Sequence, residues 1–154
     1  MDILVKKEKI FDNIVAVSGT KKEAIRTISR LCAKQTMLDA TQLEEAFWKR
    51  EEWDSTGCGE GIAIPHAIIK EIDEVQLFIV RFRYPIEWES FDDKKVDIAF
   101  AIIAPEEKGQ EKYLVFLSRL ARKLVDEKFI ADFRNCRSTE AVSVSYTHLT
   151  LPTN

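Results

Sequence analysis

Thr56-Gly57-Cys58-Gly59-Glu60-Gly61-Ile62-Ala63-Ile64-Pro65-His66-Ala67 is the stretch around which the rest of this chain is organised. Three of the five glycines of the chain stand in it at alternate positions: Gly57, Gly59 and Gly61. Glycines let a backbone turn sharply and bring its N–H groups close to a ligand. The apolar run of residues 62–64 indicates a short strand entering the core, and Pro65 keeps the residue before it extended. The stretch therefore presents His66 at a stiff position beside a glycine-rich loop.

Two ordinary interpretations compete with a reactive histidine: a packed or surface imidazole, and a glycine cluster that is only a turn. The flanking residues favour function. The octapeptide of residues 59–66, with Arg50-Glu51 ahead of it, resembles the active-site signature of the type 2 enzyme IIA family. These are the fructose/mannitol-type IIA proteins of the bacterial sugar phosphotransferase system, and the resemblance covers about residues 5–142. It implies a phosphocarrier in which His66 accepts a phosphoryl group from the carrier protein HPr and passes it to a cysteine of enzyme IIB.

Composition is consistent with a globular protein of one domain. The chain has 154 residues, of which 45% are hydrophobic and 32% charged, and its net charge is −3. We therefore expect no nucleic-acid partner, and no apolar run is long enough for membrane insertion. The three cysteines are odd in number and widely spaced, which fits neither a disulfide framework nor a zinc site. Reduced thiols and a cytoplasmic location are the expectation.

The order of apolar patterns predicts an α/β fold: a mixed central β-sheet flanked by helices on both faces. Capping boxes at Thr20 with Glu23 and at Thr41 with Glu44 indicate two helix starts. Strong apolar runs at residues 75–82 and 96–103 predict strands, the second of them central. Other expectations are a short strand at residues 14–17, a helical or irregular link at 67–73, a loop at 84–93, and helices from about residue 111 and before residue 135.

Arg50 follows Ala46 and Phe47 by four and three residues, so it shares the inner face of its helix. A positive charge is also favourable at any helix C-terminus. The family's arginine near the active histidine matches Arg50, which implies that this guanidinium holds the phosphoryl group through paired hydrogen bonds. Thr56 stands at the family's usual threonine and is a candidate phosphate donor, whereas Ser55 is expected to cap backbone groups.

The chain departs from the family at two places. Many members carry a second histidine where this chain has Tyr113. Tyrosine can donate a hydrogen bond but takes up no charge near neutral pH, so Tyr113 either orients His66 or the role is lost. The end, residues 143–154, is rich in Ser and Thr with no charged residue and resembles foreign sequence, although a native β-like tail is an alternative. We therefore place the domain at residues 1–142.

The chemistry requires neither metal nor cofactor, because HPr arrives already phosphorylated and a neutral imidazole is a good nucleophile. The implied partners are HPr, enzyme IIB and, indirectly, the membrane permease IIC; the sugar and the oligomeric state stay open.

One alternative is a regulatory IIA-like protein that signals through phosphorylation-dependent binding. Another is a binding module that has kept only the fold, which the intact His66, Arg50 and glycines disfavour. A metal-dependent hydrolase is remote, because no ligand stands at the required spacing from His66.

Overall fold

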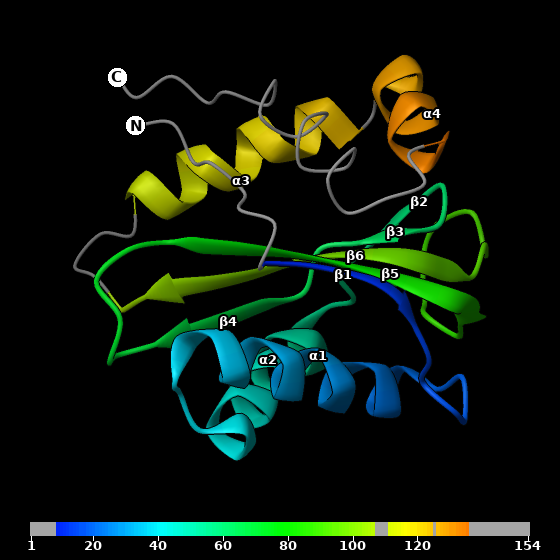
Figure 1. The fold of residues 1–154 in the computed structure, drawn as a ribbon. Helices are drawn as coiled ribbons and strands as arrows, with labels where there is room; N and C mark the ends of the chain where they lie inside the picture. The colour runs from blue at the N-terminus through cyan, green and yellow to red at the C-terminus, as the bar shows by residue number, and fades with distance from the viewer. Residues whose placement is uncertain (1–8, 107–110, 125, 136–154) are drawn as a thin grey trace.

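The computed structural model describes residues 9–106, 111–124 and 126–135. A six-stranded mixed sheet forms the middle layer, with α1 (Lys21–Thr36) and α2 (Ala40–Trp53) on one face and α3 (Glu111–Leu124) and α4 (Glu127–Asn135) on the other (Figure 1). This arrangement confirms the α/β fold with a mixed central sheet and helices on both faces. Within the described ranges, no helix is both long and apolar enough to cross a bilayer.

The strand β6 (Val96–Pro105) is the centre of the sheet, as its nearly continuous apolar sequence predicts. It pairs antiparallel with β5 (Gln76–Ile86) on one side. On its other side β3 (Ile62–Ala63) and then β4 (His66–Ile69) pair parallel with it in succession. The strands β1 (Ile10–Ile14) and β2 (Gly57–Gly59) complete the sheet beside β5 and β3 respectively.

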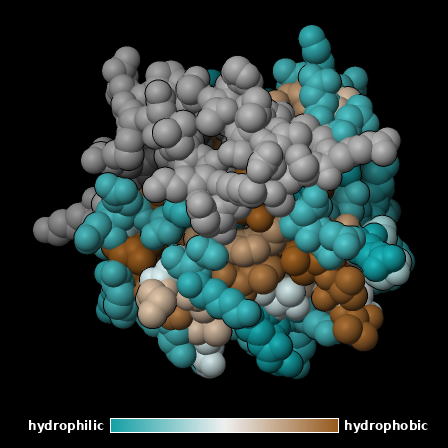
Figure 2. Space-filling view, in the orientation of Figure 1, coloured by the Kyte–Doolittle hydropathy of each residue, from teal (hydrophilic) through white to brown (hydrophobic). Residues whose placement is uncertain are grey.

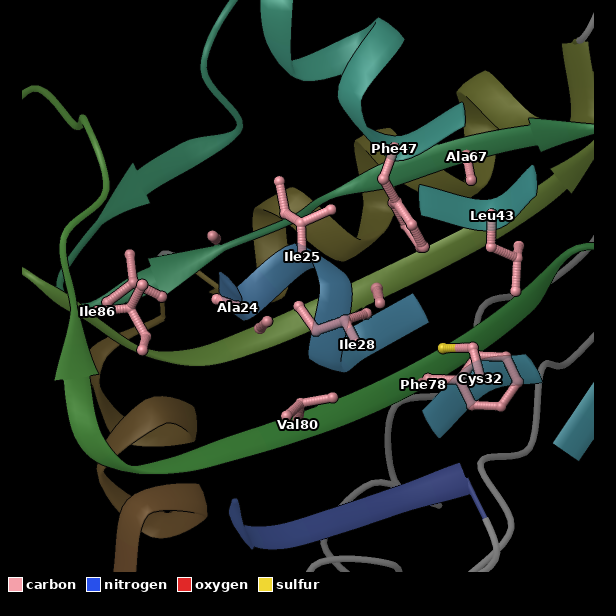
Figure 3. Close-up of a cluster of buried hydrophobic side chains, with 14 of the residues drawn as sticks. Ala24, Ile25, Ile28, Cys32, Leu43, Phe47, Ala67, Phe78, Val80 and Ile86 are labelled. Atoms are coloured by element: carbon pink, nitrogen blue, oxygen red, sulfur yellow. The ribbon is translucent and has the colours of Figure 1, made fainter. Parts of the chain in front are cut away.

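Two hydrophobic clusters hold the layers together, one on each face of the sheet. On the α1–α2 face, Ile25, Leu43 and Phe47 are almost fully buried against the strands. Figure 3 shows these side chains directed toward the sheet, with Ala67 of β4 on the strand side. The other cluster joins Leu120 and Leu124 of α3 and Phe133 of α4 to alternate residues of the same strands. Because both faces of the sheet are covered, the sequences of the central strands are nearly continuous apolar runs rather than alternations of apolar and polar residues.

The start of α1 is confirmed. Thr20 is the N-cap and its side chain accepts a hydrogen bond from the backbone N–H of Glu23. The Glu23 carboxylate, however, accepts from the N–H of Ser18, at 2.7 Å, rather than from that of Thr20. The start of α2 was predicted wrongly: its N-cap is Asp39, whose carboxylate accepts from the N–H of Gln42, and Thr41 lies inside the helix.

Three further boundaries differ from the sequence expectation. The first strand covers residues 10–14 rather than 14–17, because its pairing with β5 runs through Ile10 and Phe11. Residues 66–69 form strand β4 rather than a helical link, since their backbone pairs with residues 102–105 of β6. Residues 84–86 extend β5, and Trp88 of the expected loop is only 5% exposed. The expected tail at 143–154 lies outside the described residues.

Candidate functional site

His66 begins β4, opposite Ile102 of β6, and is held there by its neighbour: the carbonyl of Pro65 accepts a hydrogen bond from the N–H of Ile102 at 2.9 Å. Side chains alternate along a strand, so His66 lies on the same face as Ile68, which packs against the cluster beneath α3 and α4. His66 is only 6% exposed. The imidazole is therefore fixed at the edge of the core, as the proline-histidine pair predicts.

The surroundings keep this imidazole neutral. Burial, reinforced by the positive charge of Arg50, lowers the pKa of His66 from 6.5 to about 4, against the opposing effect of a backbone hydrogen bond with Pro65. A neutral ring at physiological pH has a nitrogen lone pair available for attack on phosphorus. The charge of Arg50 acts on His66, so the structure places these two predicted residues within electrostatic range of each other.

Arg50 stands in the last turn of α2, which packs on β4. Its Nη1 donates to the carbonyl of Asp54 at 2.6 Å, and its guanidinium lies 5.4 Å from the ring centroid of Trp53. Arg50 also lines a surface cavity of about 1040 Å³, together with Trp53 and Ile68. The guanidinium is thus supported by Asp54 and Trp53 at the end of α2. The cavity is lined by Glu45, Glu52 and Glu106 as well, and His66 is not part of its lining.

Thr56 is buried, and its side chain is already used. Its hydroxyl donates to Glu51, its N–H donates to both oxygens of the same carboxylate, and its carbonyl accepts from the N–H of Ile64 at 3.0 Å. Ser55 behaves as expected of a residue that caps backbone groups, because its hydroxyl donates to the carbonyl of Glu89 and accepts from the N–H of Gly57. Phosphate binding by Thr56 stays a prediction.

Gly57, Gly59 and Gly61 lie on the β2–β3 hairpin, where close packing explains them. A Cβ on Gly59 would stand 2.4 Å from the ring of Phe91, and one on Gly61 would stand 2.7 Å from Arg134. Both also have positive φ, of 86° and 77°. The hairpin pairs with β6 at Ile98 and Ala99, three or four residues from the position opposite His66, which is about 10–13 Å along a strand. Phosphate contacts of Gly57, Gly59 and Gly61 therefore stay a prediction.

Tyr113 lies in the first turn of α3, and its side chain is outside the described part of the chain, so its role as an orienting group stays a prediction. Cys58 is exposed. Partial desolvation of its sulfur and the charge of Glu51 raise the pKa of the thiol to about 11, so it is a poor nucleophile. Glu51 and Trp88 meet each other in the interior, a pairing for which the sequence carries no local signal.

The comparisons with known proteins concern the family and the fold of the chain. Residues 3–144 match the family model described as the phosphoenolpyruvate-dependent sugar phosphotransferase system, EIIA 2. The chain belongs to this EIIA type 2 family.

Individual relatives are of two kinds. A nitrogen regulatory protein of Bradyrhizobium diazoefficiens is 32% identical over 134 residues, which cover 87% of this chain and 85% of the relative. The crystal structure of nitrogen regulatory protein IIA-Ntr from Neisseria meningitidis has a TM-score of 0.80 at 28% identity, and the match covers 91% of this chain and 94% of that one. The mannitol enzyme IIA of Escherichia coli, solved in complex with phosphorylated enzyme IIB, shares the fold with a TM-score of 0.74 at 21% identity, over 94% and 97% of the two chains.

A pH-dependent stability follows from the buried imidazole of this EIIA domain. His66 takes up a proton near pH 6.5 in the unfolded chain but only near pH 4 in the folded chain. Between these pH values the unfolded state therefore binds more protons than the folded state. The free energy of unfolding consequently falls as the pH is lowered. Lowering the pH from 6.5 to about 5 should cost about 1.5 kcal/mol from this group alone. Urea unfolding at intermediate pH values measures the slope, and His66→Gln should flatten it; equal slopes in both proteins would contradict the assignment.

Gly57→Ala tests the close packing of the hairpin. A Cβ at residue 57 would stand 2.2 Å from the backbone carbonyl oxygen of Glu89, and a backbone atom cannot move aside as a flexible side chain can. We expect a loss of about 2–3 kcal/mol of stability, the range of an overpacked site. Thermal or urea unfolding gives the value, with Cys58→Ala at the exposed neighbouring position as the control. A Gly57→Ala protein as stable as this control would show that the 87–90 segment can shift freely.

Proposed function

We propose that this EIIA domain is a phosphoryl carrier of the bacterial phosphotransferase system, acting in the cytoplasm and accepting the group from phospho-HPr on His66. The supporting observation is the neutral, buried imidazole held beside the positive charge of Arg50. A ring nitrogen attacks phosphorus in line, the bond between phosphorus and the donor breaks, and the guanidinium stabilises the oxygens of the transferred group. The resulting N–P bond stays reactive, so the phosphoryl group can move on.

The recipient we propose is a cysteine thiolate of enzyme IIB, with the permease IIC completing sugar uptake. The thiolate attacks phosphorus while the bond to His66 breaks, which returns the imidazole to its neutral form. A solved relative forms a complex with phosphorylated enzyme IIB, and this supports the choice of partner class. The leaving ring nitrogen keeps the electron pair of the broken bond, and the other ring nitrogen carries the proton. The low pKa of His66 means that the neutral imidazole is a weak base and therefore a good leaving group.

A regulatory role is the second candidate. The relatives at 32% and 28% identity carry nitrogen-regulatory names, which supports a protein whose phosphorylation state controls binding to partners. In that role His66 would be phosphorylated in the same way, and the group would act as a signal rather than as cargo. The site geometry serves both roles equally, because each requires the same acceptor chemistry.

One experiment addresses the acceptor and then the recipient. The protein is incubated with phosphoenolpyruvate, enzyme I and HPr, and intact-mass spectrometry should show one acid-labile phosphoryl addition. A folded protein that gains no phosphoryl group would contradict the carrier proposal for the HPr supplied. The labelled protein is then mixed with a fructose- or mannitol-type enzyme IIB. Rapid loss of the label to the IIB cysteine supports transport, whereas a retained label favours the regulatory candidate.

A further inference from the structure

Glu51 is a carboxylate in the protein interior that the transfer reaction above does not use. It follows Arg50 in the last turn of α2, yet its side chain is only 1% exposed. A carboxylate in such a place is costly unless hydrogen-bond donors and a positive charge surround it. The contacts that offset this cost show what the carboxylate joins together.

The contacts of the Glu51 carboxylate reach three different parts of the chain. The N–H of Thr56 donates to both oxygens, at 3.0 and 2.9 Å, and the Thr56 hydroxyl donates to Oε1. Nε1 of Trp88 donates to Oε1 at 3.2 Å. The ammonium of Lys21, at the start of α1, lies 3.5 Å from Oε2 and supplies the opposite charge.

These contacts connect the two residues of the proposed reaction. On one side, Glu51 is covalently next to Arg50, so fixing its carboxylate fixes the end of α2. On the other side, it fixes Thr56, whose carbonyl accepts the N–H of Ile64 two residues before His66. A single carboxylate therefore joins the helix end that carries Arg50 to the segment between β3 and β4 that leads into His66.

We propose that Glu51 is a positioning residue for phosphoryl transfer, which sets the distance and orientation of Arg50 relative to His66 through its hydrogen bonds to Thr56. This inference rests on the proposed function. In-line transfer needs the stabilising cation in place before the reaction, and a misplacement of about 1 Å can cost on the order of a hundredfold in rate. Charge-assisted bonds from a buried carboxylate provide that rigidity.

The test compares the wild type with Glu51→Gln, which keeps the shape of the side chain but removes its charge and one acceptor oxygen. Single-turnover transfer from preformed phospho-HPr should show a maximal rate about tenfold lower, corresponding to about 1.4 kcal/mol of transition-state stabilisation. The phospho-HPr concentration giving half the maximal rate should stay within about twofold, because the docking surface is intact. Glu44→Gln, which removes the same charge from the exposed side of α2, is the matched control.

Two additions keep the test decisive if Glu51→Gln folds poorly or if HPr is not the donor. The double variant Lys21→Met with Glu51→Gln removes the ammonium that would be left unpaired, so its melting temperature should recover while its transfer rate stays low.

An NMR titration of His66 in the Glu51→Gln protein needs no phosphoryl donor. Loosening Arg50 and the surrounding packing should raise the imidazole pKa by about one unit toward its ordinary value.

The outcomes separate the inference from the proposed function. A folded Glu51→Gln or double variant with wild-type rate and wild-type His66 titration would overturn the inference, as would an equal loss of rate in Glu44→Gln. If the wild type accepts no phosphoryl group but Glu51→Gln still shifts the His66 titration, the phosphocarrier function fails and the positioning by Glu51 stands. A slower variant with unchanged half-saturation and a raised His66 pKa supports both.

Discussion

His66→Ala is expected to abolish phosphoryl acceptance while leaving the protein folded. His66 is the one imidazole among the residues that the structure describes, and the exposed Cys58 thiol has a pKa of about 11, so no comparable nucleophile lies in this part of the chain. The variant removes a ring that is 6% exposed at the start of a short strand, which should cost about 1–3 kcal/mol of stability rather than the fold. Intact-mass spectrometry after incubation with phosphoenolpyruvate, enzyme I and HPr measures the loss.

Two controls make this result specific. Cys58→Ala should be labelled as the wild type is, and the label on both proteins should be lost in acid, as expected of a phosphorus–nitrogen bond. Circular dichroism of His66→Ala confirms that it is folded. A normally labelled His66→Ala protein would place the acceptor elsewhere and remove the basis of the proposed function.

Arg50→Ala has the second largest expected effect, a transfer rate lower by about a hundredfold. Removing one well-placed donor to a developing negative charge typically costs this much, because the donor is oriented before the reaction. Stability should change little, since the contacts of Arg50 are one hydrogen bond to the Asp54 carbonyl and its stacking on the exposed Trp53. Rapid-quench measurement of transfer from phospho-HPr gives the rate.

Arg50→Lys and Arg26→Ala complete this series. A lysine keeps the charge but not the planar pair of donors, so Arg50→Lys should recover only part of the rate. Arg26→Ala removes a positive charge from a solvent-accessible ion pair with Glu44 that bridges α1 and α2, and it should transfer normally. If Arg50→Ala transfers as fast as Arg26→Ala, Arg50 serves only the end of its helix.

The sequence by itself determined the parts of this protein whose cause is local. The octapeptide ending at His66 identifies the candidate acceptor, and Pro65 predicts its stiff presentation. The Thr20 cap predicts the start of α1, and the two long apolar runs predict β5 and β6. Each of these signals depends on neighbours within a few residues, such as a side chain that reaches a nearby N–H or a run of β-branched residues.

Only the tertiary structure decided the rest. Residues 66–69 are a strand because they pair with residues 102–105, and a parallel pair leaves no alternating pattern when both faces are covered. From the sequence, Glu51 would be expected to be a solvent-exposed helix residue. In the fold, Trp88 and Lys21 surround its carboxylate. The neutral state of His66 likewise comes from burial and from Arg50, sixteen positions earlier in the chain. Burial and charge proximity depend on which distant segments meet, and that information is spread over the whole chain rather than held in any one stretch of it.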